Sequence, residues 1–315
     1  LIIGVGTRYS DFTTASKTQF KNPDVKFVNI NVTPFDAAKE SAEMVVADAR
    51  EALAALTEAL ADYRVEAAYS EEITAEKEAW LKATERCYHL DHGPLPAQTE
   101  VFGALNELMG EEDVVINAAG SMPGDLQALW QARSPLQYHV EYAFSCMGYE
   151  VPAAMGVKLA RPEAEVVSIV GDGTYQMLPM ELATVVQENI KVIYVLLQNY
   201  GFCSIGALSE SRGSQRFGTK YRQRGEGSHL ADEQVIDGVD IAANARSWGL
   251  DVLEVHTIEE FKEAYRKAEA SDRPTMIHIE TDLYGPNPPG SSWWDVPVSG
   301  VSALESTQRA YEDYQ

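Results

Sequence analysis

The sequence is poor in cysteine, in basic charge and in long apolar runs. Only 3 cysteines occur in 315 residues, widely spaced and without a C-x-x-C pair, so neither a disulfide framework nor a zinc site is indicated. Lys and Arg total 25 against 48 Asp and Glu, a formal net charge of −23, which argues against binding to nucleic acid or an anionic membrane surface. No apolar run approaches the ~20 residues of a membrane span, and no segment resembles a signal peptide. We therefore expect a cytoplasmic protein.

Hydrophobic residues make up 45% of the chain, enough for more than one domain. β-rich runs at 1–5 and 25–32, with an alanine-rich pattern at 47–60, indicate part of a Rossmann-like α/β domain. From residue 96 onward short apolar strands alternate with helical patterns, which predicts a parallel β-sheet flanked by helices. The predicted divisions are the later half of an α/β domain, a linker, a main α/β domain and a tail, at 1–60, 61–95, 96–285 and 286–315.

One aspartate stands between two glycines where an apolar strand should end and a helix should begin, in "VVSIVGDGTYQMLPMEL" (166–182). The next apolar run, "KVIYVLLQN", ends at Asn199, one helix and one strand later, so Asp172 and Asn199 should emerge at the same edge of the sheet. With a carbonyl just beyond, that of Gly201, they offer the oxygen ligands that Mg²⁺ prefers, which leaves positions for a diphosphate and water.

The residues around Asp172 also fit a bound diphosphate. Gly171 and Gly173 would let the backbone approach phosphates closely, and the following helix would present free N–H groups. Thr174 would add a hydroxyl. The alternative is a plain tight turn in which Asp172 caps the helix.

This pattern resembles the diphosphate-binding signature of thiamine diphosphate-dependent enzymes, with Gln198 in place of the first Asn of the usual pair. A second segment, "FSCMGYEVPAAMG" (144–156), is similar to another motif of that family. The resemblance implies that Met147 holds the cofactor bent and that the carbonyl of Ser145 receives its aminopyrimidine group, although Met147 could equally be core filler. It also implies that cofactor and substrate meet the loop 117–125 through two residues, Gly120 and Ser121.

Two longer segments, 199–222 and 291–299, resemble a branch of the family that acts in inositol catabolism. The resemblance implies C–C bond hydrolysis of a polyhydroxylated cyclic dione, with thiamine diphosphate and Mg²⁺ as cofactors, in a homodimer or homotetramer. It makes 96–285 the diphosphate-binding domain. Acetolactate synthase-like or decarboxylase-like chemistry, or a non-catalytic assembly role, are the alternatives.

In this family the glutamate that activates the cofactor lies in an N-terminal pyrimidine-binding domain. The present chain begins "LIIGVG", without Met and within what looks like a buried strand, so we expect it to be the C-terminal part of a longer polypeptide. None of its acidic residues fits that glutamate's motif. We therefore predict that this chain alone binds the cofactor weakly at best and does not turn over.

Several polar and aromatic residues have open roles. His139 and His229 could move protons near the site, but a hydrogen-bonded structural histidine is the commoner case. Trp293 and Trp294 could pack the tail or close over the cofactor. Polar residues of the 204–228 loop suit a hydroxyl-rich substrate, or could face water on a flexible lid: Ser209, Ser211, Ser214, Gln215 and Arg216.

Overall fold

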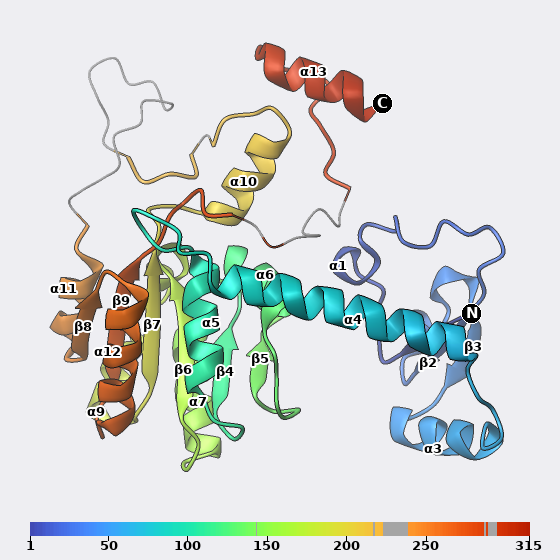
Figure 1. Ribbon diagram of the computed structural model, residues 1–315, viewed down its shortest axis with the longest axis horizontal. Helices are drawn as coiled ribbons and strands as arrows, with labels where there is room; N and C mark the ends of the chain where they lie inside the picture. The colour runs from blue at the N-terminus through green and yellow to red at the C-terminus, as the bar shows by residue number, and fades with distance from the viewer. Residues whose placement is uncertain (143, 217, 223–238, 287, 289–294) are drawn as a thin grey trace. The chain divides into compact units, whose positions relative to one another are not determined.

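The computed structural model describes residues 1–315 except 143, 217, 223–238, 287 and 289–294. The chain divides into two compact units, the first built mainly from Leu1–Ala79 and the second beginning at Trp80. Figure 1 shows the elements of both units, coloured along the chain from blue to red. No helix in the described part of the chain is both long enough and apolar enough to cross a membrane.

The first unit contains a parallel sheet in the order β1-β2-β3. Its strands are β1 (Ile2–Val5), β2 (Phe27–Asn31) and β3 (Glu43–Val46), and its short helical turns are α1 (Asp11–Thr14), α2 (Pro34–Ala37) and η1 (Lys39–Ser41). The longer helix α3 (Ala49–Ala59) begins after Asp48, whose carboxylate accepts from two backbone N–H groups, as an N-cap residue should. β3 was not predicted, because its side chains are mostly exposed and give no buried-strand pattern.

Helix α4 (Ala67–Tyr88) occupies most of the predicted linker. Its last turn is buried, with Thr84, Cys87 and Tyr88 facing inward. The Tyr88 hydroxyl donates to the carbonyl of Leu129 at 2.6 Å, which fixes the end of the helix within the second unit.

The second unit is built on a sheet in the order β5-β4-β6-β7-β9-β8, in which every neighbouring pair is parallel. Its strands are β4 (Val114–Asn117), β5 (Tyr138–Val140), β6 (Val166–Gly171), β7 (Ile193–Gln198), β8 (Asp251–Val255) and β9 (Thr275–Glu280). The predicted fold class is confirmed. The short, half-buried β5 was not predicted.

Helices cover both faces of this sheet (Figure 1). One face packs against α5 (Gln98–Leu108), α6 (Ser121–Leu129) and α12 (Ile258–Ala270), and the other against α7 (Glu150–Ala160), α9 (Glu181–Gln187) and α11 (Ile241–Trp248). Alternate residues of β7 enter the two cores: Val195 packs in one and Tyr194 in the other. A strand buried on both faces must be apolar throughout, which explains the run "IYVLLQ".

The helix expected after Asp172 is interrupted. α8 (Asp172–Tyr175) is a single turn, and α9 begins only at Glu181. Pro179 lies between them, and a proline has no backbone N–H with which to continue a helix. Two further helices, α10 (Cys203–Ser211) and α13 (Glu305–Tyr314), follow β7 and end the chain.

The strand order contains a topological switch point between β4 and β6. β4 pairs with β5 on one side and with β6 on the other, so the chain leaves β4 in one direction and leaves β6 in the opposite direction. Such a switch point is where open parallel sheets bind ligands, beyond the carboxyl ends of the strands. The loops after β4 and β6 contain Gly120 and Asp172.

Candidate functional site

Asp172 and Asn199 lie together at the carboxyl ends of β6 and β7, which are parallel neighbours. Asp172 Oδ2 accepts from the backbone N–H of Asn199 at 3.2 Å and from that of Tyr200 at 2.6 Å. Its Oδ1 accepts from the N–H of Gly173 at 2.8 Å. The N-cap of α8 is Gly171 rather than Asp172, so the carboxylate joins the ends of two strands instead of only capping a turn.

The Asp172 carboxyl is deeply buried, with 1% of the residue exposed. Burial raises its pKa to about 6, although the backbone N–H groups of Tyr200, Gly173, Asn199 and Gly201 favour the ionised form. Among the described residues, no salt bridge joins Asp172 to a basic side chain. The carboxylate is therefore hydrogen-bonded but not paired with a counter-charge in this part of the chain.

Asn199 adds an oxygen that has no partner among the described residues. Its side-chain Oδ1 is buried and receives no hydrogen bond from them, an arrangement that costs free energy unless a ligand compensates for it. A desolvated carboxylate beside an unpartnered amide oxygen fits the donor set of a hard cation such as Mg²⁺. No group of at least three His, Cys, Asp or Glu side chains in the described residues could hold a metal, so a metal here would depend on this mixed set of ligands.

Gly201, the third predicted metal ligand, follows Tyr200, which has a left-handed backbone conformation with φ 59°. A β-bridge joins Gly201 to Lys220. A Cβ atom on Gly201 would lie 2.4 Å from the carbonyl oxygen of Thr219, so only glycine fits where the chain folds back on itself. The fold-back places 219–221 beside the end of β7.

Aromatic side chains approach the Gly-Asp-Gly turn. A Cβ on Gly173 would lie 2.8 Å from the Phe202 ring and 3.3 Å from the Tyr221 hydroxyl, and one on Gly171 would lie 3.1 Å from Met122 Cε. The Phe202 and Tyr221 rings meet edge to face at 5.8 Å. Gly173 was predicted to make room for phosphate, and in this structure it also makes room for these rings.

The other residues predicted for the diphosphate region have specific partners. The Thr174 hydroxyl donates to Glu150 Oε2 at 2.9 Å and accepts from the backbone N–H of Gly148 at 2.6 Å. Gln198, the departure from the family pattern, is hydrogen-bonded through its Oε1 to the imidazole Nε2 of His278 at 2.9 Å. Gln198 is thus engaged with β9, whereas Asn199 retains its unpartnered oxygen.

The residues predicted to meet the rest of the cofactor lie on neighbouring loops. Gly120 has φ 100° and precedes α6, and the Ser121 hydroxyl donates to Gln98 Oε1 at 3.1 Å. Ser145 has φ 51°, and both it and Met147 are half-buried between β5 and α7. Met147 directly precedes Gly148, whose bond to Thr174 places this segment next to the Gly-Asp-Gly turn.

Sequence reasoning missed two acids at this edge of the sheet, one fully buried and one half-buried. Glu150 is fully buried at the start of α7, and its position as the one acid within the small and apolar segment 144–156 was the available signal. Asp125, on α6, accepts from the Gln98 side chain, and burial raises its pKa to about 6. Nothing in the local pattern of "SMPGDLQAL" indicated that Asp125 would be desolvated.

The polar residues predicted for the 204–228 loop differ in their surroundings. Ser209 and Ser211 lie in the helix α10 rather than in a loop, and their hydroxyls donate to the carbonyls of Gln215 and Leu208. Arg216 is different: only 7% of its side chain is exposed, and its Nε donates to Glu210 at 2.8 Å. Its guanidinium lies 4.6 Å from the centre of the Tyr284 ring, and its Nη1 is buried with no hydrogen-bond partner in the part of the chain that the structure describes.

Of the remaining residues with predicted roles, His139 lies in the described part of the chain and three others do not. His139 Nε2 is hydrogen-bonded to the Tyr149 hydroxyl at 2.7 Å, and the two rings stack at 5.8 Å. His229, Trp293 and Trp294 lie outside the described residues, as do parts of the segments 204–228 and 291–299.

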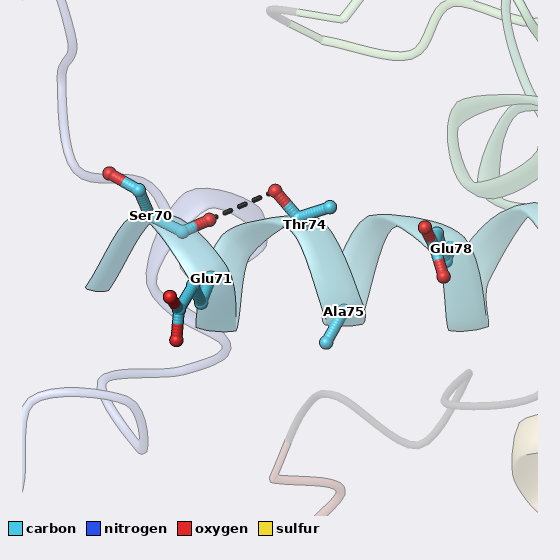
Figure 2. Close-up of a pocket in the computed structure, with 5 residues that line it drawn as sticks. All are labelled: Ser70, Glu71, Thr74, Ala75 and Glu78. Carbon is cyan, nitrogen blue, oxygen red and sulfur yellow. Dashed lines mark hydrogen bonds between the residues drawn. The ribbon is translucent and has the colours of Figure 1, made fainter. Parts of the chain in front are cut away.

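A shallow hollow also lies along α4 in the first unit. Figure 2 shows the residues that line it, with the Thr74 hydroxyl bonded to the Ser70 carbonyl: Ser70, Glu71, Thr74, Ala75 and Glu78. All of them come from one exposed helix face, and no sequence prediction falls on them. The hollow supports no functional assignment.

Comparison with known proteins agrees with this geometry. Residues 118–279 match the family described as "Thiamine pyrophosphate enzyme, C-terminal TPP binding domain", a range that includes Gly120, Asp172 and Asn199. The chain belongs to the thiamine pyrophosphate enzyme family. A solved thiamine diphosphate-dependent 4-hydroxybenzoylformate decarboxylase from Rhodococcus jostii RHA1 shares the fold at TM-score 0.60 and 19% identity, over 82% of this chain and 44% of that one.

Curated relatives match nearly the whole chain. The 3D-(3,5/4)-trihydroxycyclohexane-1,2-dione hydrolase 2 of a Bacillus cereus strain is 41% identical over 336 aligned positions, 99% of this chain and 52% of that protein. The proteins named as the same hydrolase in Bacillus anthracis and Bacillus thuringiensis are 39% and 40% identical with the same coverage. The chain thus spans about half the length of the curated relatives it matches.

Proposed function

We propose that this chain supplies the diphosphate- and Mg²⁺-binding part of a thiamine diphosphate-dependent enzyme that hydrolyses a C–C bond in 3D-(3,5/4)-trihydroxycyclohexane-1,2-dione, giving a deoxy-hexuronic acid. One observation carries the proposal: the buried Asp172 carboxylate, bonded by backbone N–H groups, adjoins the unpartnered amide oxygen of Asn199. The names of the relatives, at about 40% identity, support the choice of substrate.

In this proposal each predicted residue has one task. Asp172, Asn199 and the carbonyl of Gly201 hold the metal ion, and the glycines beside Asp172 admit the diphosphate. Met147 and Gly120, on the adjoining loops, orient the organic part of the cofactor. Once bound, thiamine diphosphate supplies the electron sink that the cleavage of a C–C bond next to a ketone requires. Phe202 and Tyr221, which pack over the turn, limit the access of water to the metal.

Arg216 is the residue of the 204–228 loop best placed to recognise an oxygen-rich substrate. Its side chain is held on one side by Glu210 and on the other by Tyr284, so little conformational entropy is left to lose on binding. The unpartnered Nη1 can donate to a hydroxyl or ketone oxygen. The serines of the same loop are already bonded to backbone carbonyls, which leaves them less able to discriminate between substrates.

The activating glutamate is proposed to come from the part of the protein that this chain does not span. Glu150, the acid buried closest to the predicted cofactor loops, already accepts from Ala119, Gly148 and Thr174, so its carboxylate is not free to meet a pyrimidine nitrogen. The chain alone is therefore expected to bind the cofactor weakly and to show no turnover.

A chimera tests this function. The chain is joined to the part of the B. cereus relative that it does not span, and ring opening of the cyclic dione is compared with turnover of pyruvate, both with thiamine diphosphate and Mg²⁺. We expect the chimera, but not the chain alone, to hydrolyse the dione, and we expect the chimera with Asp172→Asn to be inactive. Turnover of pyruvate without turnover of the dione would overturn the substrate assignment. Absence of any heat on titration with the cofactor would favour a non-catalytic assembly role.

A further inference from the structure

We propose that Glu150 is a positioning residue whose single carboxylate holds three segments of the site in one arrangement: its own, at the start of α7, and two distant ones, before α6 and after β6. The inference rests on the proposed function for what those segments bind, but the arrangement itself can be tested without any ligand. Glu150 is not one of the residues expected to contact the metal or the diphosphate. It would act only through the segments to which it is bonded.

Each segment bonded to Glu150 carries a residue predicted for the cofactor site. Oε1 accepts from the backbone N–H of Ala119 at 3.2 Å, and Ala119 precedes Gly120. Oε2 accepts from the backbone N–H of Gly148 at 3.1 Å, and Gly148 follows Met147. Oε2 also accepts from the Thr174 hydroxyl at 2.9 Å, at the end of the Gly-Asp-Gly turn.

Further bonds make this connection rigid. The Thr174 hydroxyl accepts from the same Gly148 N–H at 2.6 Å, so the second and third segments are joined directly as well as through Glu150. The Glu150 backbone carbonyl accepts from the Ser168 hydroxyl on β6 at 2.9 Å. Glu150 is thereby anchored to the strand that leads to Asp172, at the switch point where the loops after β4 and β6 separate.

Stability alone does not explain a carboxylate at this position. Glu150 is 0% exposed, and taking a carboxylate out of water costs free energy that its hydrogen bonds only partly recover. Apolar residues of similar volume are often no worse for stability at such positions. What an apolar side chain could not do is accept hydrogen bonds from the neighbouring Gly148 N–H and, at the same time, from two groups distant in the sequence, the Ala119 N–H and the Thr174 hydroxyl.

The geometry also predicts the effect of the smallest possible substitution. In Glu150→Gln the side chain keeps its shape but replaces one acceptor oxygen with an NH₂ group. In one orientation of the amide, the NH₂ group faces the N–H of Ala119. In the other orientation, the NH₂ group faces the N–H of Gly148. Either way two donors face each other in a buried place, and one of the segments is released.

The test measures backbone hydrogen exchange in the free chain and then with thiamine diphosphate and Mg²⁺. In Glu150→Gln we expect faster exchange around Ala119, Gly148 and Thr174, with the core strand β7 unchanged, and a roughly tenfold weaker affinity for the cofactor. The control is Glu165→Gln. Glu165 directly precedes β6, at the end of the strand opposite to Asp172, and its carboxylate is paired with Lys191. This control should change neither exchange in the three segments nor cofactor affinity.

The possible outcomes separate this inference from the proposed function. Unchanged exchange in the three segments of Glu150→Gln would overturn the positioning role, and so would faster exchange spread evenly over the whole sheet, which is the mark of a merely structural residue. If the unsubstituted protein showed no response to cofactor while Glu150→Gln still released the three segments, the proposed function would fail and the positioning role would stand.

Discussion

Asp172 and Glu150 are two buried carboxylates at the same edge of one sheet, and they differ in what surrounds them. Burial raises the pKa of both. Glu150 receives donors from three segments and is saturated. Asp172 accepts from backbone N–H groups around its own turn and the end of the next strand, beside an amide oxygen that has no donor. Burial alone therefore does not distinguish a carboxylate that holds structure from one that is proposed to bind a cation, whereas the neighbouring acceptor does.

Asp172→Asn should have the largest effect. Removing the ionised ligand is expected to weaken Mg²⁺-dependent affinity for thiamine diphosphate on the order of 100-fold or more, beyond the loss expected for Glu150→Gln. The melting temperature of the free protein should also fall, because the NH₂ group of the new amide must face a backbone N–H in a buried place, either that of Gly173 or those of Asn199 and Tyr200. Calorimetric titration and thermal unfolding measure the two quantities. Equal losses of affinity in the two variants would break the distinction between Asp172 and Glu150.

Asn199→Leu should have a smaller effect of the same kind. It removes the unpartnered oxygen at nearly constant volume, so cofactor affinity should fall roughly tenfold, while the stability of the free protein should hold or rise because a buried unpaired acceptor is lost. The same titration and unfolding experiments apply. A large loss of stability with unchanged affinity would show that the Asn199 amide serves the fold and not a ligand.

The pH dependence should be the mildest of these effects. Because the pKa of Asp172 is raised to about 6 in the folded protein, the folded state binds a proton there more readily than the unfolded state does. The contribution of Asp172 to the free energy of unfolding is therefore largest at low pH and is lost as pH rises through about 6. Mg²⁺ needs the ionised carboxylate, so metal-dependent binding should weaken as pH falls below about 6. Asp172→Asn should reduce the pH dependence of stability near pH 6 and leave only the part contributed by Asp125, whose pKa is also raised to about 6; an unchanged dependence would assign it to groups other than Asp172.

The features that could be predicted from the sequence are those set by two neighbouring strands and the helix that connects them. The apolar runs before Asp172 and Asn199 are buried on both faces of the sheet, and parallel strands one helix apart bring their carboxyl ends together. Nothing more than hydrophobic pattern and strand order is needed for that step. The apolar pattern after Asp172 continues through Pro179 and indicates one long helix. The helical backbone, however, is interrupted there.

The parts that were not predicted depend on segments far apart in the chain. Two partners of Glu150, Ala119 and Thr174, lie 31 and 24 residues away, and no local pattern specifies that these segments meet. The same is true of Phe202 and Tyr221, which reach Gly173 only because the chain folds back at Gly201. Exposed edges such as β3 and β5 carry too few buried side chains to be recognised as strands.

The most direct test of the central claim is the titration of this protein with thiamine diphosphate in the presence of Mg²⁺, repeated with Mg²⁺ removed by a chelator, for the unsubstituted chain and for Asp172→Asn. We predict measurable, if weak, binding only with Mg²⁺ and only when Asp172 is present. Binding of equal strength with and without Mg²⁺, or unchanged by Asp172→Asn, would contradict the assignment of a metal to Asp172 and Asn199.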